Sequence, residues 1–182
     1  MRILADETKV SQLIDRLAEA VGRDVAGFKA SGQWALVGLR SRGDVLARRL
    51  AAKLHPDHVG TLDFTLYRDD LQDAGSQALV QATEIDFAVD GMNVVLVDDV
   101  LMTGRSVRAA LQSLMDLGRP QRVWLAVLVD RGGRELPIAA DHVALDLTGP
   151  TLSPRETVEV RLRPTDECDQ ISVCSADEPV IE

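Results

Sequence analysis

Residues 94–106 read Val94-Val95-Leu96-Val97-Asp98-Asp99-Val100-Leu101-Met102-Thr103-Gly104-Arg105-Ser106, and this stretch decides the fold. Its first four residues are apolar and three of them are β-branched, which predicts a short buried strand at 94–97. Two carboxylates follow the predicted strand, and Thr103-Gly104 then makes a turn. Apolar residues recur beyond it at helical spacing: Val107, Ala110, Leu111, Leu114 and Met115. The stretch therefore predicts a strand–loop–helix unit of an α/β fold.

The loop of this unit suits a sugar phosphate. Ligands of open α/β sheets bind at the carboxyl ends of the strands, and a helix N-terminus there attracts anions. Asp98 and Asp99 stand upstream of the turn, where they can accept hydrogen bonds from vicinal hydroxyls. No lysine follows the glycine as in a nucleotide P-loop, and receiver domains carry their acid pair near the chain start. The alternative is a strand-end turn with solvated acids; the complete pattern favours the sugar-phosphate site.

A second strand–loop–helix unit precedes the first. Trp34–Leu39 is predicted to be a buried strand, residues 40–43 a loop, and the segment through Leu54 a helix. Arg40 and Arg42 stand at the carboxyl end of this strand, and guanidinium groups match phosphate oxygens. Ordinary surface arginines are the alternative; the expected position across from residues 94–106 favours an anion site.

The rest of the chain completes the α/β pattern. We expect a helix at 8–22, ended near a glycine, and the helix after residue 104 ends at Leu117-Gly118-Arg119-Pro120. Strands are predicted at 62–67, 85–89, 123–129, 142–145, 157–162 and 170–174. The polar segment 68–81 is predicted to be a flexible loop, and the tail 175–182 to be frayed.

Composition narrows the class of protein. The 182 residues predict a single domain, 1–182, with 46% hydrophobic residues for its core. The net charge of −9 argues against a generally basic surface, and neither a membrane-length apolar run nor a signal-peptide pattern is visible. Two cysteines without a metal spacing fit a reducing compartment, so we expect a cytoplasmic protein. His55 and His58 flank a proline and predict a solvated turn rather than a metal site, and His142 predicts packing or surface.

Several separated motifs together resemble one family. They are residues 37–43, 63–70, 94–106, 117–120 and 125–138. The central motif resembles the phosphoribosyl-diphosphate (PRPP) binding motif of type I phosphoribosyltransferases. Within that superfamily the chain resembles the PyrR family of uracil phosphoribosyltransferases and pyrimidine-operon attenuators. The resemblance implies a type I phosphoribosyltransferase fold: a central, mostly parallel twisted sheet flanked by helices, with a small hood and a flexible loop.

The resemblance also implies roles for particular residues. The acids and an arginine of the flexible loop would be catalytic: Asp98, Asp99 and Arg68. The ribose and its 5′-phosphate would bind at Asp98, Asp99, Val100, Leu101, Met102, Thr103, Gly104, Arg105 and Ser106. Pyrophosphate would bind at Arg40, Ser41, Arg42 and Gly43, and the base at Val129, Asp130 and Arg131. Mg²⁺ is expected with PRPP, with Asp98 and Asp99 as candidate ligands.

The activity implied is conversion of uracil and PRPP to uridine monophosphate (UMP) and diphosphate. The same resemblance implies a UMP-responsive protein that binds leader mRNA, and a homodimer or larger homo-oligomer. Two alternatives stay open: an RNA-binding regulator with weak or no catalysis, and a phosphoribosyltransferase for another base.

Overall fold

The computed structural model describes residues 1–28, 32–63, 83–149, 152–153 and 155–175. A five-stranded sheet forms its centre. The strand order is β3 (His58–Leu62), β2 (Trp34–Leu39), β4 (Asn93–Leu101), β5 (Arg122–Asp130) and β6 (His142–Asp146). Every neighbouring pair is parallel, as the continuous apolar runs predict for strands covered on both faces.

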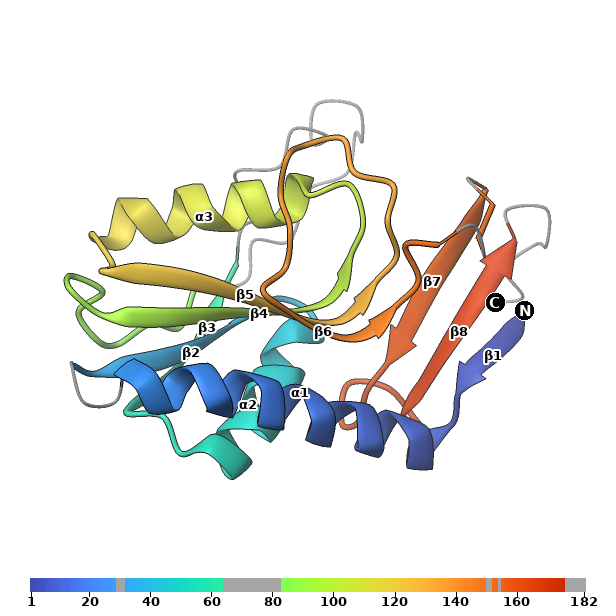
Figure 1. The fold of residues 1–182 in the computed structure, drawn as a ribbon, viewed down its shortest axis with the longest axis horizontal. Coiled ribbons are helices and arrows are strands. Elements are labelled where there is room, and N and C mark those ends of the chain that lie inside the picture. The colour runs from blue at the N-terminus through green and yellow to red at the C-terminus, as the bar shows by residue number, and fades with distance from the viewer. Residues whose placement is uncertain (29–31, 64–82, 150–151, 154, 176–182) are drawn as a thin grey trace.

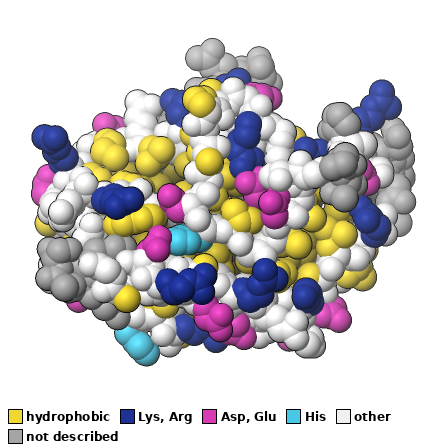
Figure 2. Space-filling model, in the orientation of Figure 1, with side chains coloured by type: hydrophobic (Ala, Val, Ile, Leu, Met, Phe, Trp, Pro, Cys, Tyr) yellow, Lys and Arg dark blue, Asp and Glu magenta, His cyan; other side chains and the backbone are white. Residues whose placement is uncertain are grey.

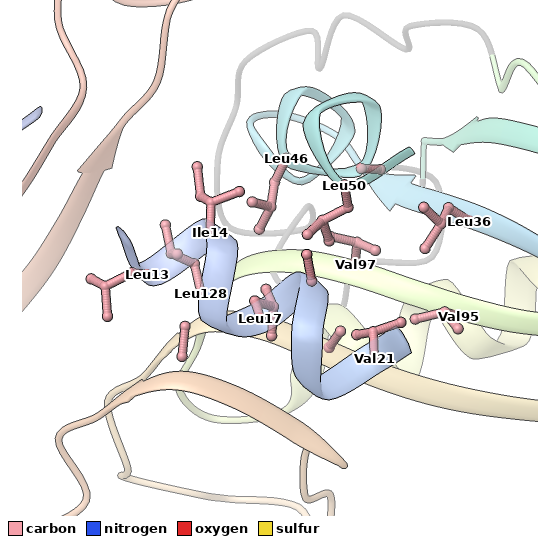
Figure 3. Packing of buried hydrophobic residues seen from close by; sticks show 14 of the residues in the cluster. Leu13, Ile14, Leu17, Val21, Leu36, Leu46, Leu50, Val95, Val97 and Leu128 are labelled. Carbon is pink, nitrogen blue, oxygen red and sulfur yellow. The ribbon is translucent and has the colours of Figure 1, made fainter. Parts of the chain in front are cut away.

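Helices cover both faces of this sheet. α1 (Glu7–Phe28) and α2 (Gly43–Leu54) lie on one face, and α3 (Arg105–Leu117) lies on the other (Figure 1). Alternate strand residues point to opposite faces, so Val95 and Val97 pack in the cluster with α1 and α2 while Val94 and Leu96 pack in the cluster with α3. Figure 3 shows the first cluster, with side chains of both helices directed at the strands.

A second, antiparallel sheet lies at one end of the central sheet (Figure 1). Its order is β1 (Arg2–Ala5), β8 (Gln170–Ser175) and β7 (Glu156–Arg161). The predictions of strands at 157–162 and 170–174 are confirmed to within a residue, and this sheet is the expected hood. β1 was not predicted, because a four-residue strand with three partly or fully exposed positions carries little periodic signal.

Three predictions were wrong. β3 at His58–Leu62, which pairs in parallel with β2, was not predicted, and the strand predicted at 62–67 lies mostly outside the described residues, which omit 64–82. Segment 85–89 is not a strand, because among the described residues only an isolated bridge, Thr61 with Glu84, joins this part of the chain to the sheet edge. Apolar spacing continues α1 beyond residue 22 through Val25. β4 continues beyond residue 97 through Leu101, because its pairing with β5 continues.

The topology places a switch point between β2 and β4. The connection through α2 leads from β2 outward to β3, and the connection through α3 leads from β4 the opposite way to β5. Where the direction of winding reverses in an open α/β sheet, a crevice forms at the carboxyl ends of the strands. None of the described helices is long and apolar enough to cross a membrane.

Candidate active site

The loop after β2 lies directly against β4. Gly38 pairs with Val97, and the loop that follows crosses over the next residues of β4. A Cβ atom added to Gly43 would lie 2.6 Å from the carbonyl oxygen of Val97 and 3.2 Å from Cα of Asp98. The absence of a side chain therefore lets the loop 40–43 reach the acid pair. The Arg40–Ser41 peptide bond in this loop is cis.

Asp98 and Asp99 lie within β4 rather than beyond its end. Asp98 is only 7% exposed, and its Oδ1 accepts a hydrogen bond of 3.0 Å from the backbone N–H of Asp99. Burial raises the pKa of Asp98 well above the usual range, and the charge of Asp99 raises it further. Burial also raises the pKa of Asp99, an effect that Asp98 and the positive charge of Arg42 oppose. The two carboxylates are thus close together, and their interactions within the protein do not fully replace the hydration that they lose on burial.

The turn after β4 opens at the N-terminus of α3. Gly104 has φ +89°, a conformation that glycine adopts readily, and the next residue begins the helix. The Thr103 hydroxyl oxygen accepts a hydrogen bond of 3.3 Å from the Arg105 N–H. The first N–H groups of a helix have no partner within the helix, so this end of α3 offers donors to an anion.

Segment 131–138, which follows β5, braces that turn. The N–H groups of Glu135 and Leu136 donate to the carbonyl oxygen of Thr103 at 3.0 and 3.1 Å. Arg134 donates to the carbonyl oxygens of Met102 at 2.7 Å and Ile138 at 2.8 Å. Arg134 also pairs with the buried carboxylate of Asp130. Sequence reasoning missed Arg134 as a site residue, although it lies inside the motif 125–138.

The predicted base-binding residues stand beside this segment. Asp130 pairs with Leu101 across the sheet and accepts a hydrogen bond of 2.9 Å from the Gly132 N–H. The Arg131 guanidinium donates to the carbonyl oxygens of Ser153 and Glu156, so it ties the loop to the hood. Val129 is fully buried. What this arrangement offers a base is therefore backbone groups rather than the side chain of Arg131.

The predicted pyrophosphate arginines both have acidic partners. Arg40 pairs with Glu84 at 3.3 Å. Arg42 donates from Nε and Nη2 to the two carboxylate oxygens of Asp166, each at 2.9 Å. Asp166 belongs to the connection between β7 and β8, far from the loop in sequence. Arg68, the predicted catalytic arginine, lies outside the described residues.

The donor set suits a hard cation shared with a substrate. Asp98 and Asp99 present adjacent carboxylates, of which Asp98 is buried and Asp99 partly buried, and burial raises the pKa of both. In the described part of the chain no group of three or more His, Cys, Asp or Glu side chains is placed to hold a metal. Mg²⁺ commonly uses one or two carboxylates together with water and phosphate oxygens, so the pair fits it.

The three histidines fit structural roles in this geometry. His58 begins β3 and stacks on Phe87, with 4.7 Å between ring centroids. His142 is 3.4 Å from a carboxylate oxygen of Asp24, with a largely buried side chain. His55 ends α2 in a left-handed conformation, its N–H bonded to the carbonyl oxygen of Ala51.

Comparisons with known proteins identify the family. Residues 2–152 match the model of the phosphoribosyl transferase domain. The Bifunctional protein PyrR of Pelotomaculum thermopropionicum is 46% identical over 175 residues, which are 93% of each chain. That of Deinococcus deserti is 46% identical over 176 residues, covering 94% of this chain and 92% of the relative. This chain belongs to the PyrR family of phosphoribosyltransferases.

Solved structures place this PyrR-family chain in the expected fold. The hypoxanthine phosphoribosyltransferase of Trypanosoma cruzi superposes with a TM-score of 0.67 and 18% identity, covering 96% of this chain and 97% of that one. A Staphylococcus aureus hypoxanthine phosphoribosyltransferase gives a TM-score of 0.58 at 16% identity, covering 79% of this chain and 76% of that chain. At these identities the likeness shows the fold alone. The predicted type I phosphoribosyltransferase fold is confirmed.

Proposed function

We propose that this PyrR-family chain transfers the phosphoribosyl group of PRPP to uracil, giving UMP and diphosphate. The observation that carries the proposal is the adjacent pair of buried Asp98 and partly buried Asp99, which lies at the switch point between two loops suited to anions. PRPP carries a phosphate and a diphosphate on either side of its two ribose hydroxyls. The protein likewise has two loops with anion-binding donors and, between them, two carboxylates that can accept hydrogen bonds from hydroxyls.

In this reaction the bond from the anomeric carbon to diphosphate breaks and a bond to N1 of uracil forms. The electron pair of the broken bond leaves with diphosphate, and the N1 proton of uracil passes to the released diphosphate or to water. Asp98 and Asp99 accept hydrogen bonds from the ribose hydroxyls, and their charge stabilises the positive charge that develops at the ring. A well-placed group of this kind is typically worth about 100- to 1000-fold in rate.

The loops orient the two ends of PRPP. Thr103, Gly104, Arg105 and Ser106 donate to the 5′-phosphate from hydroxyl and N–H groups at the start of α3. Arg40 and Arg42 meet the diphosphate from the loop after β2, and their charge favours the leaving group. Mg²⁺, when bound with PRPP at Asp98 and Asp99, supplies charge neutralisation to the diphosphate and ribose oxygens.

The test is an assay of UMP formation from uracil and PRPP with Mg²⁺. We expect turnover by the wild type, a loss of about 100-fold or more in the Asp98→Asn/Asp99→Asn variant, and little change in Asp15→Asn, an exposed carboxylate on α1. Turnover untouched by the double substitution would remove the assignment. A panel of bases in the same assay tests the choice of uracil, since Val129, Asp130 and Arg131 offer mainly backbone contacts.

A second candidate function is binding of a leader RNA, because the similar proteins are named bifunctional. On the face seen in Figure 2, basic side chains are interleaved with acidic ones, and the whole chain carries a net charge of −9. RNA binding would therefore rest on a local group of cations, and its affinity would fall with salt. A mobility shift of pyrimidine leader RNA with UMP, measured against salt, tests this function. No shift at low salt would reject it.

Two further expectations accompany the enzymatic proposal. We infer a homodimer or larger homo-oligomer, which light scattering of the purified protein tests. A cytoplasmic location stays a prediction from the sequence.

A further inference from the structure

The connection between β7 and β8, residues 162–169, forms an ion pair with the loop 40–43, which we propose binds diphosphate. We call residues 162–169 the hood turn. Arg42, at the end of the loop after β2, forms a two-pronged pair with Asp166 of the hood turn, with both N–O distances at 2.9 Å. Charge-assisted fork-to-fork pairs of this type fix orientation as well as contributing energy. The hood turn and the loop 40–43 therefore hold each other in place.

The Asp166 carboxylate is itself fixed by the backbone of its turn. Its Oδ2 accepts a hydrogen bond of 2.7 Å from the Leu162 N–H, and the Asp166 N–H donates to the Leu162 carbonyl oxygen at 3.0 Å. The pair with Arg42 holds the pKa of Asp166 below its usual range, so this carboxylate is ionised at neutral pH. The backbone of the hood turn thus holds the Asp166 carboxylate in position to accept hydrogen bonds from Arg42.

The pair leaves one edge of the guanidinium available. Asp166 takes Nε and Nη2 of Arg42, and Nη1 has no hydrogen-bond partner among the described residues. The Arg42 side chain is 30% exposed. The hydrogen bonds to Asp166 raise the pKa of Arg42, and the nearby charge of Asp99 raises it further. An arginine held along one edge beside the acid pair presents its other edge to an anion docking there.

We propose that Asp166 is a positioning residue that acts through Arg42: it orients the guanidinium so that the free edge binds the diphosphate of PRPP. The inference rests on the proposed function for the identity of the anion. It assigns a role in substrate binding to a hood residue 124 positions away from the loop it serves. Without Asp166, Arg42 keeps its charge but loses its fixed direction, and that freedom must be lost again when diphosphate binds.

The chain contains a matched control for this pair. Asp169, also in the hood turn, accepts hydrogen bonds from Nη1 and Nη2 of Arg49 in the same two-pronged way. Arg49 lies within α2 and donates as well to the Arg163 carbonyl oxygen. Removing the Asp169 carboxylate weakens the same turn without touching the residue that faces the anion. It separates a loss of hood stability from a loss of Arg42 orientation.

The experiment measures diphosphate binding and PRPP kinetics. Calorimetry with Mg²⁺ and diphosphate on Asp166→Asn is expected to show roughly ten-fold weaker binding, and PRPP KM to rise by a similar factor with kcat changed less. Asp169→Asn is expected to lower the melting temperature but to leave both values within two-fold of wild type. Asp166→Glu, which keeps a carboxylate, is expected to recover part of the loss.

The route through Arg42 is tested in a second background. The Arg42→Ala substitution is itself expected to weaken diphosphate binding. Adding Asp166→Asn to that variant is expected to cause no further loss of diphosphate affinity. Tighter diphosphate binding by Asp166→Asn, an equal loss in Asp169→Asn, or additive losses in the double variant would each overturn the proposal. If Asp166→Asn does not fold, Asp166→Ser takes its place, because it also removes the carboxylate while leaving Arg42 unchanged. Diphosphate binding needs no uracil, so failure of the uracil assay leaves this result interpretable.

Discussion

Asp98 is a residue at which stability and the proposed function oppose each other. Its carboxylate is buried next to Asp99, and burial and then the charge of Asp99 raise its pKa. A group with a raised pKa in the folded state binds its proton more tightly there than in the unfolded chain. The protein therefore loses stability as the pH rises from about 4, the unfolded value, to the raised value of the folded state. Selection for stability alone would remove this carboxylate.

We expect Asp98→Asn to be more stable than the wild type in metal-free buffer near neutral pH. Asparagine is neutral and its side-chain oxygen still accepts from the Asp99 N–H. The gain is expected to be on the order of 1 kcal/mol and to shrink toward zero as the pH falls to about 4. Urea unfolding at several pH values with a chelator measures it. A variant less stable than the wild type at neutral pH would contradict the argument.

Gly43 is a residue at which close packing determines how near the loop 40–43 lies to Asp98. A Cβ there would meet the backbone of β4 at 2.6 Å, and backbone cannot move aside as the end of a flexible side chain can. We expect Gly43→Ala to cost about 1–3 kcal/mol of stability and to reduce turnover, because the loop must shift away from Asp98. Unfolding in urea and the UMP assay measure the two effects.

Gly27→Ala is the control for that substitution. Gly27 lies in α1, and a Cβ added there would have nothing within 4 Å. Alanine is preferred to glycine inside a helix by about 0.5–1 kcal/mol, so this variant is expected to be slightly more stable with unchanged turnover. Equal losses in both variants would show that the contact with β4 is not the cause.

At the scale of elements, the strands and helices that carry the site were predictable from local pattern. Trp34–Leu39 and Val123–Val129 are continuous apolar runs, and the spacing that begins at Val107 marks α3. Parallel strands end at one edge, so the meeting of the loops after β2, β4 and β5 also followed from the sequence. β3 was not predicted because His58–Leu62 contains a glycine and a histidine and has only Val59, Thr61 and Leu62 as strand formers.

The bracing contacts of the site were not predictable. Arg134 bonds carbonyl groups 32 positions away, and Asp166 pairs with an arginine 124 positions away. No local period records such pairings, because they depend on how loops from different strands are brought together. The periodic spacing of apolar residues in helices and strands predicts the fold, whereas the polar contacts between loops depend on the assembled structure.

Arg134 joins two elements of the site, and its removal is expected to affect both. It supports the carbonyl groups of Met102 and Ile138 and neutralises Asp130. We expect Arg134→Ala to lose about 1.5–3 kcal/mol of stability and to raise KM for both PRPP and uracil, since the turn and the base segment lose their common support. Thermal unfolding and steady-state kinetics measure these changes.

Arg48→Ala is the comparison for Arg134. Arg48 is half exposed on α2 and pairs with Asp44 one helical turn away. Exposed pairs of this kind contribute little, so stability is expected to change by less than about 1 kcal/mol and kinetics to stay as in the wild type. A similar loss in both variants would mean that arginine removal in general, rather than the brace, is responsible.

At the scale of the whole molecule, the site joins three parts of the fold. The parallel sheet supplies the acids and three loops, α3 supplies a helix N-terminus, and the hood reaches the loops through Arg131 and Asp166. The acid pair of β4 is negative, whereas the N-terminus of α3 is positive. A ligand that carries phosphate groups and a cation can contact all three parts at once. Its binding is therefore expected to stabilise the whole folded protein.

We therefore expect PRPP with Mg²⁺ to raise the melting temperature of the protein. At a ligand concentration about 100 times Kd the gain is about 2.7 kcal/mol, which corresponds to a shift of roughly 5–10 °C for a chain of this size. With a chelator in place of Mg²⁺ the shift is expected to fall by more than half, because Asp98 and Asp99 then face the phosphates without a cation between them. In Asp98→Asn/Asp99→Asn the shifts with Mg²⁺ and with the chelator are expected to be equal. Differential scanning fluorimetry of both proteins measures all four shifts, and a magnesium-dependent shift that persists in the double variant would place the cation elsewhere.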